Sequence, residues 1–269
     1  MSDITVIIPY YNSTDTIERA LDSVYCQTVS AAAIIIVDDN SSYSSLEYLY
    51  QLIKRKYDLT MIPIDVIVQE KNNGPAKARN IGWNLAKTSF IAFLDSDDSW
   101  HHKKLEIQLK YFLDDPSLIM CGHKMKVITA DSCHHLNIED LNYKTISKNL
   151  ILSKNYFQTP SVIIRNNIQN RFPEYQRFSE DYYLWIDIIL DNHKSIYLSE
   201  PLAFCHKPFY GSSGLSANLL SMEKSELKNY LMFYKKNKIN LSALVFFSTL
   251  SICKFLVRLI KTLIKTRLK

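Results

Sequence analysis

The sequence predicts an α/β protein with a Rossmann-like, mostly parallel sheet flanked by helices. Three observations support this prediction: short β-branched runs that end at polar loops, helical periodicity between those runs, and their alternation over residues 4–94. Strands buried on both faces are continuously apolar, and strand–helix–strand repeats form parallel crossovers. A doubly wound sheet is therefore expected.

The first half of the chain supplies most of these elements. The expected strands cover residues 4–8, 33–37, 64–68 and 90–94, and the expected helices cover 17–24, 46–57 and 75–87. Ser13 or Thr14 is expected to cap the first helix, and Pro75 to open the third. In the second half the alternation stops, and residues 124–148 are predicted to be irregular. A helix over residues 182–190 follows. Its inward residues are Leu184, Trp185, Ile188 and Ile189.

Composition narrows the classes of function. Of the 269 residues, 47% are hydrophobic and 22% are charged, as in soluble globular proteins. The five cysteines are scattered without CxxC spacing, which argues against a disulfide framework or a structural zinc site and indicates a reduced, cytosolic setting. The N-terminus shows no export signal and leads directly into a strand. With five glycines and no glycine-rich fingerprint, the sequence argues against a dinucleotide dehydrogenase or a Walker-type NTPase.

Three loops follow the carboxyl ends of predicted strands, where ligands bind in open α/β sheets. They are residues 9–12, 38–42 and 95–98. The last loop holds Asp95, Asp97 and Asp98, whose like charges are costly to bring together unless a cation offsets them. Hard carboxylate oxygens suit Mg²⁺ or Mn²⁺, which usually share themselves with substrate phosphates. We therefore expect a metal site here, with a solvated turn or a helix cap as the alternative.

Other charged residues lie near the remaining strand ends. Asp38 and Asp39 are expected to meet the base N–H and ribose hydroxyl groups of a nucleotide, or else to cap the next helix. Lys77 and Arg79 are expected to pair with a diphosphate or with the acidic cluster, and ordinary solvated charge is the alternative.

Glu180 and Asp181 stand directly before an apolar helix. The helix dipole favours an ionised carboxylate at this end, which suits a general base that takes a proton from a substrate hydroxyl. Simple N-capping is compatible with the same residues, and the sequence does not separate the two roles.

Five motifs occur in one order between residue 4 and about residue 190. They are Val6-Ile7-Ile8-Pro9-Tyr10-Tyr11-Asn12, Val37-Asp38-Asp39-Asn40-Ser41, Ala78-Arg79-Asn80-Ile81-Gly82, Phe93-Leu94-Asp95-Ser96-Asp97-Asp98 with Trp100, and Glu180-Asp181-Tyr182 with Leu184-Trp185. Together they resemble the family 2 glycosyltransferases of the GT-A fold. The resemblance implies inverting transfer of a sugar from a nucleotide sugar, with no covalent sugar intermediate.

The resemblance also implies the roles of the acidic residues. Asp39 would contact the nucleotide base. Asp95 and Asp97 would form the DxD pair that binds ribose and metal, and Asp98 is the alternative metal ligand. The general base would be Asp181 or, with less support, Glu180. The expected contacts to the nucleotide sugar are Pro9, Tyr11, Asp38, Asp39, Lys77, Arg79, Asp95, Ser96 and Asp97.

Two further positions bear on the resemblance. His206 lies in a region where related enzymes often place a metal or phosphate contact, and a structural histidine is the alternative. Asn40 stands where the family often has glycine. Because asparagine tolerates a left-handed backbone, the turn is expected to survive.

The C-terminal segment differs in charge from the rest of the chain. Nine Lys or Arg and no acidic residue occur between Lys235 and Lys269, so residues 1–234 carry a net charge of −4 within a chain of +5. One helical stripe is basic: Lys254, Arg258, Lys261 and Lys265. The opposite stripe is apolar: Ile252, Phe255, Leu256, Leu259 and Leu263.

This pattern predicts an amphipathic helix that lies in a membrane surface, with its cations at anionic headgroups. The apolar run 244–253 is expected to be too short to span a membrane before Lys254 intervenes. A helix docked on the body of the protein, with a solvated basic edge, is the alternative.

These expectations describe a cytoplasmic glycosyltransferase that is peripheral on the inner face of the cell membrane. Residues 1–220 would form the GT-A catalytic domain, with a nucleotide-sugar half at 1–113 and an acceptor half at 114–220, and residues 221–269 would form the basic helical tail. The expected donor is UDP-galactose or UDP-glucose. The expected acceptor is a polyprenyl diphosphate-linked saccharide of O-antigen or capsule synthesis. Mn²⁺ or Mg²⁺ is the expected cofactor, and no nucleic-acid partner is expected.

Two alternatives come from other classes of protein. A sugar-phosphate nucleotidyltransferase would normally carry a glycine-rich basic loop after the first strand, and residues 9–12 supply none. A catalytically silent nucleotide-binding protein would not need all of the carboxylates that this chain retains.

Overall fold

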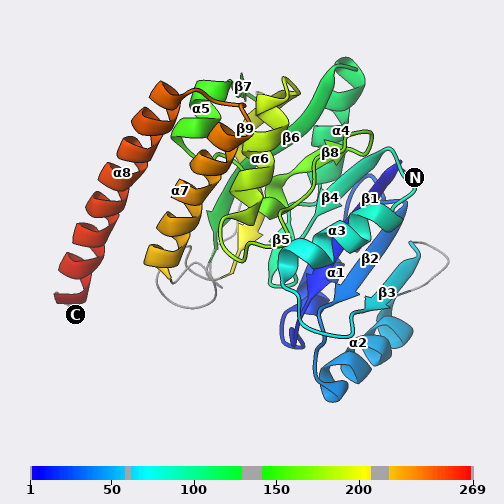
Figure 1. The fold of residues 1–269 in the computed structure, drawn as a ribbon. Helices are drawn as coiled ribbons and strands as arrows, with labels where there is room; N and C mark the ends of the chain where they lie inside the picture. The colour runs from blue at the N-terminus through cyan, green and yellow to red at the C-terminus, as the bar shows by residue number, and fades with distance from the viewer. Residues whose placement is uncertain (1, 58–61, 129–140, 207–217, 268–269) are drawn as a thin grey trace.

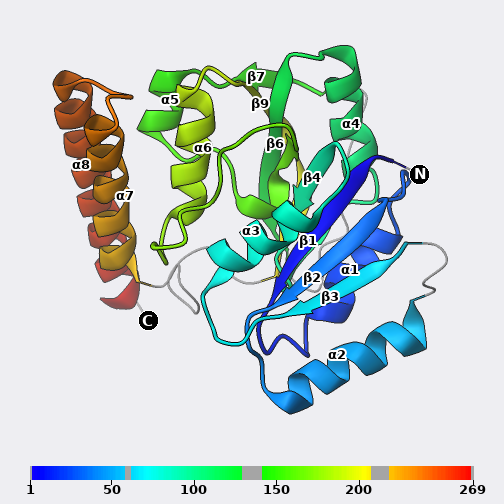
Figure 2. The ribbon, with the colours of Figure 1, turned by 45° about the vertical axis from the view of Figure 1, so that its right-hand side comes forward.

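The computed structural model describes residues 2–57, 62–128, 141–206 and 218–267, with side chains up to residue 260. Within these residues, nine strands form one sheet with helices on both faces (Figures 1 and 2). The strands are β1 (Ile4–Tyr10), β2 (Ala33–Asp38), β3 (Ile64–Val68), β4 (Phe90–Phe93), β5 (Asp98–Trp100), β6 (Leu118–Val127), β7 (Tyr143–Thr145), β8 (Ile163–Arg165) and β9 (Lys194–Cys205). The helices are α1 (Ile17–Tyr25), α2 (Tyr43–Lys56), α3 (Pro75–Leu85), α4 (Lys104–Asp114), α5 (Lys148–Ser153), the 3₁₀ turn η1 (Thr159–Ser161), α6 (Glu180–Leu190), α7 (Leu219–Lys235) and α8 (Leu241–Arg267).

The strand order is β3-β2-β1-β4-β8-β6-β9-β5, with β7 paired to β9. Strands β1 to β4 are parallel and joined by α1, α2 and α3, which confirms the predicted crossovers. The second half is mixed, because β8 is antiparallel to β4 and β6 while β6 and β9 are parallel. The sheet is therefore less parallel than predicted. Strand β6 also runs to Val127, into the segment that was expected to be irregular.

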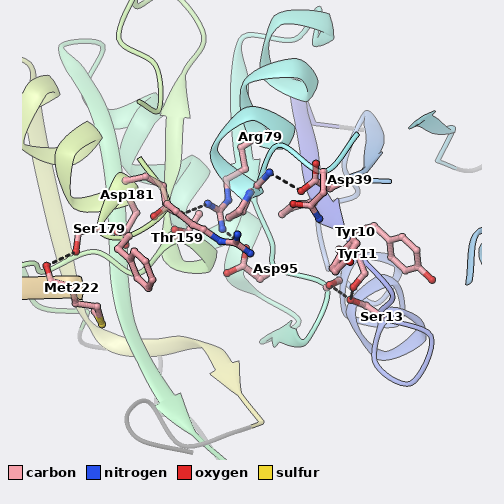
Figure 3. Close-up of a pocket in the computed structure, with 18 residues that line it drawn as sticks. Tyr10, Tyr11, Ser13, Asp39, Arg79, Asp95, Thr159, Ser179, Asp181 and Met222 are labelled. Atoms are coloured by element: carbon pink, nitrogen blue, oxygen red, sulfur yellow. Dashed lines mark hydrogen bonds and ion pairs between the residues drawn. The ribbon is translucent and has the colours of Figure 1, made fainter. Parts of the chain in front are cut away.

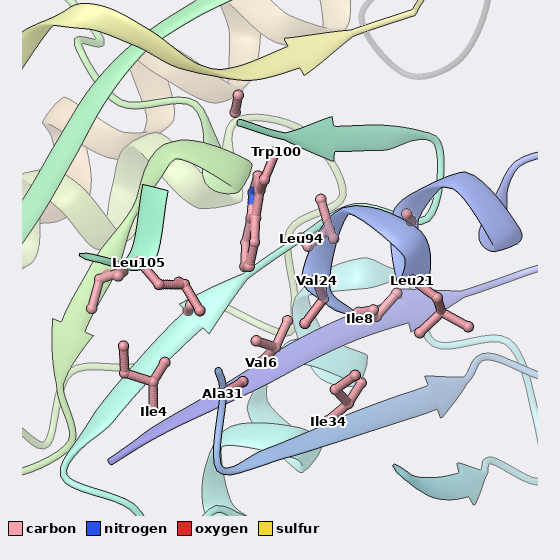
Figure 4. Packing of buried hydrophobic residues seen from close by; sticks show 14 of the residues in the cluster. Ile4, Val6, Ile8, Leu21, Val24, Ala31, Ile34, Leu94, Trp100 and Leu105 are labelled. Atoms are coloured by element: carbon pink, nitrogen blue, oxygen red, sulfur yellow. The ribbon is translucent and has the colours of Figure 1, made fainter. Parts of the chain in front are cut away.

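The core lies on both faces of the sheet. Successive side chains of a strand point to opposite faces, so Val6 and Ile8 of β1 pack with Leu21 and Val24 of α1 on one face (Figure 4). Ile7 joins the other face, where α3 and α6 pack. A fully buried aliphatic side chain contributes about 1.5–3 kcal/mol. The apolar runs therefore fix the strands that carry the polar loops.

The helix starts agree with the sequence in part. Helix α3 begins at Pro75 as predicted, after Gly74, whose φ of 87° few other residues adopt. The predicted cap of α1 is wrong, because neither Ser13 nor Thr14 caps it with a side chain. The Ser13 hydroxyl is bonded to Ser96 instead, and the Ser13 carbonyl accepts the first helical N–H groups.

Helix α6 begins two residues before the predicted start, at Glu180. All four of its predicted inward residues are buried. The carboxylates of Glu180 and Asp181 thus stand in the first turn of a helix that the core holds in place.

Helices α7 and α8 lie side by side and antiparallel at one end of the molecule (Figures 1 and 2). The segment Leu241–Ile260 has 20 residues, a mean hydropathy of 1.9, and 11% of its residues buried. By length and composition it is able to cross a membrane, which corrects the expectation that the run is too short. Lys254 and Arg258 lower its hydropathy but do not divide it.

Each face of α8 has its own surroundings. Exposed apolar residues form an outer face, defined here as Leu241, Val245, Phe246, Ile252, Leu256 and Ile260. On the docked face, Arg258 pairs with Glu223 of α7 at 3.1 Å, and the Lys254 ammonium donates to the Ser153 carbonyl. The two basic residues therefore contact the body of the protein, which corrects the expectation that they meet headgroups. Lys261 and Lys265 lie beyond the described side chains.

Candidate active site

The loops at the carboxyl ends of β1, β2 and β4 meet the N-terminus of α6 around a cavity of about 580 Å³ (Figure 3). We call it the strand-end cavity. The predicted residues that line it are Pro9, Tyr11, Asp39, Arg79, Asp95, Ser96, Glu180 and Asp181. Thr159, Arg177 and Met222 line it too, and sequence reasoning missed them. Arg177 is exposed. Its position three residues before Glu180 is the sequence feature that could have identified it as a cavity residue.

Asp39 holds the loop that leads into α3. Its carboxylate accepts hydrogen bonds from the Gln69 side chain at 2.8 Å and from the backbone N–H groups of Asn73 and Gly74 at 2.7 and 2.8 Å. Neither Asp38 nor Asp39 caps α2, since the Ser42 hydroxyl does so. A carboxylate has about four acceptor positions, so three bonds leave Asp39 room for one contact to a ligand.

Three residues predicted to bind the nucleotide, Asp38, Lys77 and Asp97, do not line the strand-end cavity. Asp38 is fully buried and accepts from the Ser41 N–H at 3.1 Å, which shapes the turn after β2. Lys77 is on the surface of α3, and its ammonium nitrogen lies 3.9 Å from a carboxylate oxygen of Glu174. Within the same turn, Asn40 has a φ of 62°, which confirms the predicted left-handed backbone.

Arg79 links two of the acidic motifs. Its guanidinium is buried and lies 2.7 Å from Asp95 and 3.1 Å from Glu180. Burial alone would lower the pKa of Arg79, but the two carboxylates outweigh it and raise that pKa. Arg79 thus contacts one of its two predicted partners, the acidic cluster, through Asp95. A buried charge needs such partners, so Arg79 fixes both carboxylates in place.

The two acids of α6 have different surroundings. Burial raises the pKa of Glu180 to about 7, and Arg79 offsets part of that rise. Burial also raises the pKa of Asp181, while the Tyr182 N–H, 2.7 Å away, lowers it. The Asn155 amide donates to Asp181 at 3.4 Å. Glu180 therefore faces Arg79, whereas Asp181 receives neutral hydrogen-bond donors.

A second cavity, of about 800 Å³, adjoins the first. We call it the α8 cavity, because Lys254, Val257 and Arg258 of that helix line it. Five residues line both cavities: Asp95, Thr159, Ser179, Asp181 and Met222. Sequence reasoning missed this space, because it placed α8 on an outer surface.

The remaining predicted metal ligands lie around the turn after β4. Asp98 is buried in β5 and lines the α8 cavity. The His206 ring nitrogen Nε2 lies 2.8 Å from the Ser99 hydroxyl. Burial and Arg19 lower the pKa of His206, and Asp97 raises it.

Among the described residues, no three His, Cys, Asp or Glu side chains form a ready metal cage. Asp95 and Asp97 are both partly exposed at the strand end. Their hard oxygens suit a cation that completes its shell with substrate phosphate and water. The donor set therefore fits the predicted Mg²⁺ or Mn²⁺ when a phosphate-bearing substrate is present.

Solved structures define the class of fold. S. aureus TarS (residues 1–349) in complex with UDP-GlcNAc is 20% identical, with a TM-score of 0.67 over 87% of this chain and 67% of that chain. The mannosyltransferase PcManGT of Pyrobaculum calidifontis, in complex with GDP-Man and Mn²⁺, is 15% identical, with a TM-score of 0.63 over 87% and 64%. The protein therefore has the GT-A fold of glycosyltransferases.

The sequence profile of Glycosyl transferase family 2 matches residues 5–173. The chain belongs to this family. The matched span holds Asp39, Arg79 and Asp95, and it ends before α6.

Curated relatives narrow the context. The Escherichia coli UDP-Glc:alpha-D-GlcNAc-diphosphoundecaprenol beta-1,3-glucosyltransferase WfgD is 30% identical over 198 residues, which are 71% of this chain and 72% of that protein. The amylovoran biosynthesis glycosyltransferase AmsB of Erwinia amylovora is 25% identical over 251 residues, 87% of this chain and 77% of that protein. The chain spans 26% of the Rickettsia bellii uncharacterised glycosyltransferase, to which it is 32% identical. These relatives are all glycosyltransferases, in agreement with the family match.

Proposed function

We propose that the protein is an inverting hexosyltransferase that moves glucose or galactose from a UDP-sugar to a polyprenyl diphosphate-linked saccharide. The donor class is supported by the UDP-Glc in the name of WfgD and by the UDP-GlcNAc bound to TarS. The acceptor class is supported by the diphosphoundecaprenol in the name of WfgD. The product would enter a surface polysaccharide such as O-antigen or capsule.

The position of Asp181 is the observation that carries this proposal. Asp181 lines both the strand-end cavity and the α8 cavity, so a donor in one and an acceptor in the other meet at its carboxylate. Glu180 pairs with Arg79 instead. A carboxylate between two substrates is placed to take the proton of an acceptor hydroxyl as that hydroxyl attacks the anomeric carbon. Attack from the side opposite the leaving nucleotide inverts the anomeric configuration.

The other residues bind and orient the substrates. The nucleotide lies against Pro9, Tyr11 and Asp39 in the strand-end cavity, where Ser96 and Arg177 supply further polar contacts. Arg79 is a positioning residue, because it fixes the carboxylates of Asp95 and Glu180 without needing to contact substrate.

Asp95 and Asp97 would hold Mn²⁺ or Mg²⁺, which offsets negative charge on the departing nucleoside diphosphate. The Mn²⁺ in the PcManGT complex supports this assignment. Asp98 and His206 rank below this pair, because the pairing of β5 with β9 buries Asp98 and the Ser99 hydroxyl engages His206.

Release of nucleoside diphosphate tests the reaction class. Purified protein is incubated with UDP-, GDP- and dTDP-sugars and a lipid-linked saccharide extract, with Mn²⁺ or with a chelator. We expect release from one UDP-hexose, loss of release with chelator, and loss of metal-dependent turnover in Asp97→Ala. No release from any donor, or equal release in chelator, would overturn the assignment.

We also propose that residues 1–220 form the catalytic unit and that residues 221–269 hold it at the inner face of the cell membrane. The outer face of α8 is apolar, whereas its docked face carries the Arg258 to Glu223 ion pair and the Lys254 contact. Ionised side chains are costly within the hydrocarbon core, and α7, on which α8 is docked, has five charged side chains among its 17 residues. We therefore place α8 in the interface, with its outer face toward the lipid. Membrane fractionation after charge insertion, described in the Discussion, tests this placement.

A further inference from the structure

The α8 cavity is lined by both acidic and basic side chains, Glu226 and Arg258 among them. Asp95, Asp98 and Asp181 line it where it adjoins the strand-end cavity. Lys254 of α8 and Lys154, which directly follows α5, line it elsewhere. The two lysines are neighbours in space, because the Lys254 ammonium donates to the carbonyl of Ser153, the residue before Lys154. The fold thus brings together two cations that lie a hundred residues apart in sequence.

The lysines differ from the third cation of this cavity in their partners. Arg258 is paired with Glu223 at 3.1 Å. In the described part of the chain, no acidic side chain lies within ion-pair distance of Lys154 or Lys254. The Lys154 ammonium lies 5.2 Å from the centroid of the Tyr156 ring, and the Lys254 ammonium donates to the neutral Ser153 carbonyl. Their charges are therefore available to an anionic ligand.

The cavity also reaches the outer face of α8. Val257 lines the cavity and is 51% exposed. Leu256, beside it in sequence, belongs to the outer face. A ligand that reaches from Asp181 to Val257 would therefore meet carboxylates, lysines and apolar surface in one cavity. A sugar hydroxyl, a diphosphate and a hydrocarbon chain occur in that order in a lipid-linked saccharide.

We propose that Lys154 and Lys254 bind the diphosphate of the lipid-linked acceptor, with the saccharide toward Asp181 and the lipid leaving past Val257. This inference rests on the proposed function and adds to it the residues that recognise the acceptor. Lysine ammonium groups form charge-assisted hydrogen bonds with phosphate oxygens. Helix α8 then serves as a wall of the acceptor site as well as the contact with the membrane.

Vesicle binding tests the inference without requiring turnover. Full-length protein, with UDP and Mn²⁺ in excess, is mixed with phosphatidylcholine vesicles, with vesicles that also contain undecaprenyl diphosphate, or with vesicles brought to the same surface charge by phosphatidylglycerol. We expect tighter binding to the diphosphate vesicles than to either control. Lys154→Ala and Lys254→Ala should each weaken that extra affinity by about tenfold, and the double variant should abolish it.

Matched variants separate recognition from damage to the fold. Lys224→Ala removes the same charge from an exposed position of α7 outside the cavity and should keep the extra affinity. Lys254→Arg should keep most of it. Equal binding of all variants to vesicles of phosphatidylcholine alone would indicate that α8 remains docked on the body of the protein. Unchanged diphosphate binding in the double variant, or equal binding of the unmutated protein to phosphatidylglycerol and diphosphate vesicles, would overturn the inference.

The same proteins in the nucleotide-release assay keep the two proposals apart. Lysine-dependent diphosphate binding without release from any sugar donor would defeat the reaction assignment and leave the lipid-binding site. Release from a UDP-hexose with lysine-independent diphosphate binding would defeat the site and leave the reaction.

Discussion

Exchanging the two acids of α6 one at a time separates the general base from its neighbour. Asp181→Asn keeps the size of the side chain and can still accept a hydrogen bond from Tyr182, but it cannot take a proton. Loss of a general base costs about 10²–10⁴ in rate. We therefore expect kcat to fall by that factor, with donor affinity unchanged, because the nucleotide contacts of the strand-end cavity remain.

The expected effect of Glu180→Gln is much smaller. Burial raises the pKa of Glu180, which lowers the free-energy cost of replacing its carboxylate by a neutral group. Glutamine still offers an oxygen to the Arg79 guanidinium, 3.1 Å away in the native pair. The change removes the negative charge of the acceptor but keeps the charged Arg79 donor, which costs about 1 kcal/mol. Transfer should fall by about tenfold or less.

The assay measures kcat and the donor KM for each variant with the UDP-sugar found in the donor panel, together with UDP affinity by calorimetry. Transfer by Asp181→Asn at the rate of the unmutated protein would refute the assignment of the base. A loss in Glu180→Gln as large as that in Asp181→Asn would refute the argument from the two environments.

The same residue predicts the pH dependence. Burial raises the pKa of Asp181 above its ordinary value of 3.8, and a base works only when deprotonated. The acidic limb of kcat/KM should therefore lie above the range of an ordinary aspartate. The folded state also binds this proton more tightly than the unfolded state does. The stabilisation that the bound proton provides is therefore lost as pH rises through the pKa of Asp181 in the folded state. Asp181→Asn should thus raise the melting temperature at pH 7.5, and a rate that stays flat down to pH 4 would contradict the reasoning.

Three other changes test the fold. Burial lowers the pKa of Lys104 to about 7, so the free energy of unfolding should rise with pH between about 7 and 10 by on the order of 4 kcal/mol. Lys104→Met should remove that pH dependence and raise the free energy of unfolding at pH 7, measured by urea titration. A destabilised variant would contradict this. A Cβ at Gly122 would lie 2.3 Å from the Phe157 ring, so Gly122→Ala should cost about 1–3 kcal/mol in the same titrations, and an unchanged midpoint would show that the ring can yield. Leu256→Glu on the outer face of α8 should move the protein from membrane to soluble fractions with its melting temperature kept, and unchanged fractionation would defeat the membrane placement.

The sequence predicted the N-terminal half of the fold well, because its signals are local. Continuous β-branched runs such as Ala33–Asp38 have few structural alternatives when helical periodicity flanks them. The loops that follow such strands share one edge of a parallel sheet, so Asp39 and Asp95 line one cavity as expected. The second half of the sequence has weaker signals, because antiparallel strands such as β8 are only three residues long and are not flanked by a crossover helix with a recognisable periodicity.

Side-chain pairing within the site lay beyond the sequence. Arg79 pairs with Glu180, which is 101 residues away in the sequence. No local sequence pattern indicates which of several acidic residues pairs with a given basic residue. That pairing nevertheless decides the chemistry, because it occupies Glu180 and leaves Asp181 facing both cavities. The motif supplied two candidate bases, and we propose Asp181 on the basis of this packing.

Helix α8 shows the same limit on a larger scale. Periodicity correctly separates a basic stripe from an apolar one, but it does not say which stripe faces the protein. The docked face is decided by partners elsewhere in the chain: the buried Ser251 donates to Glu223, which also holds Arg258. Because these partners draw the cations inward, the apolar stripe is left outside, where lipid can cover it. The proposed membrane contact and the proposed recognition of an anionic acceptor both depend on this docked orientation of α8, so a variant that turned α8 over should lose both together.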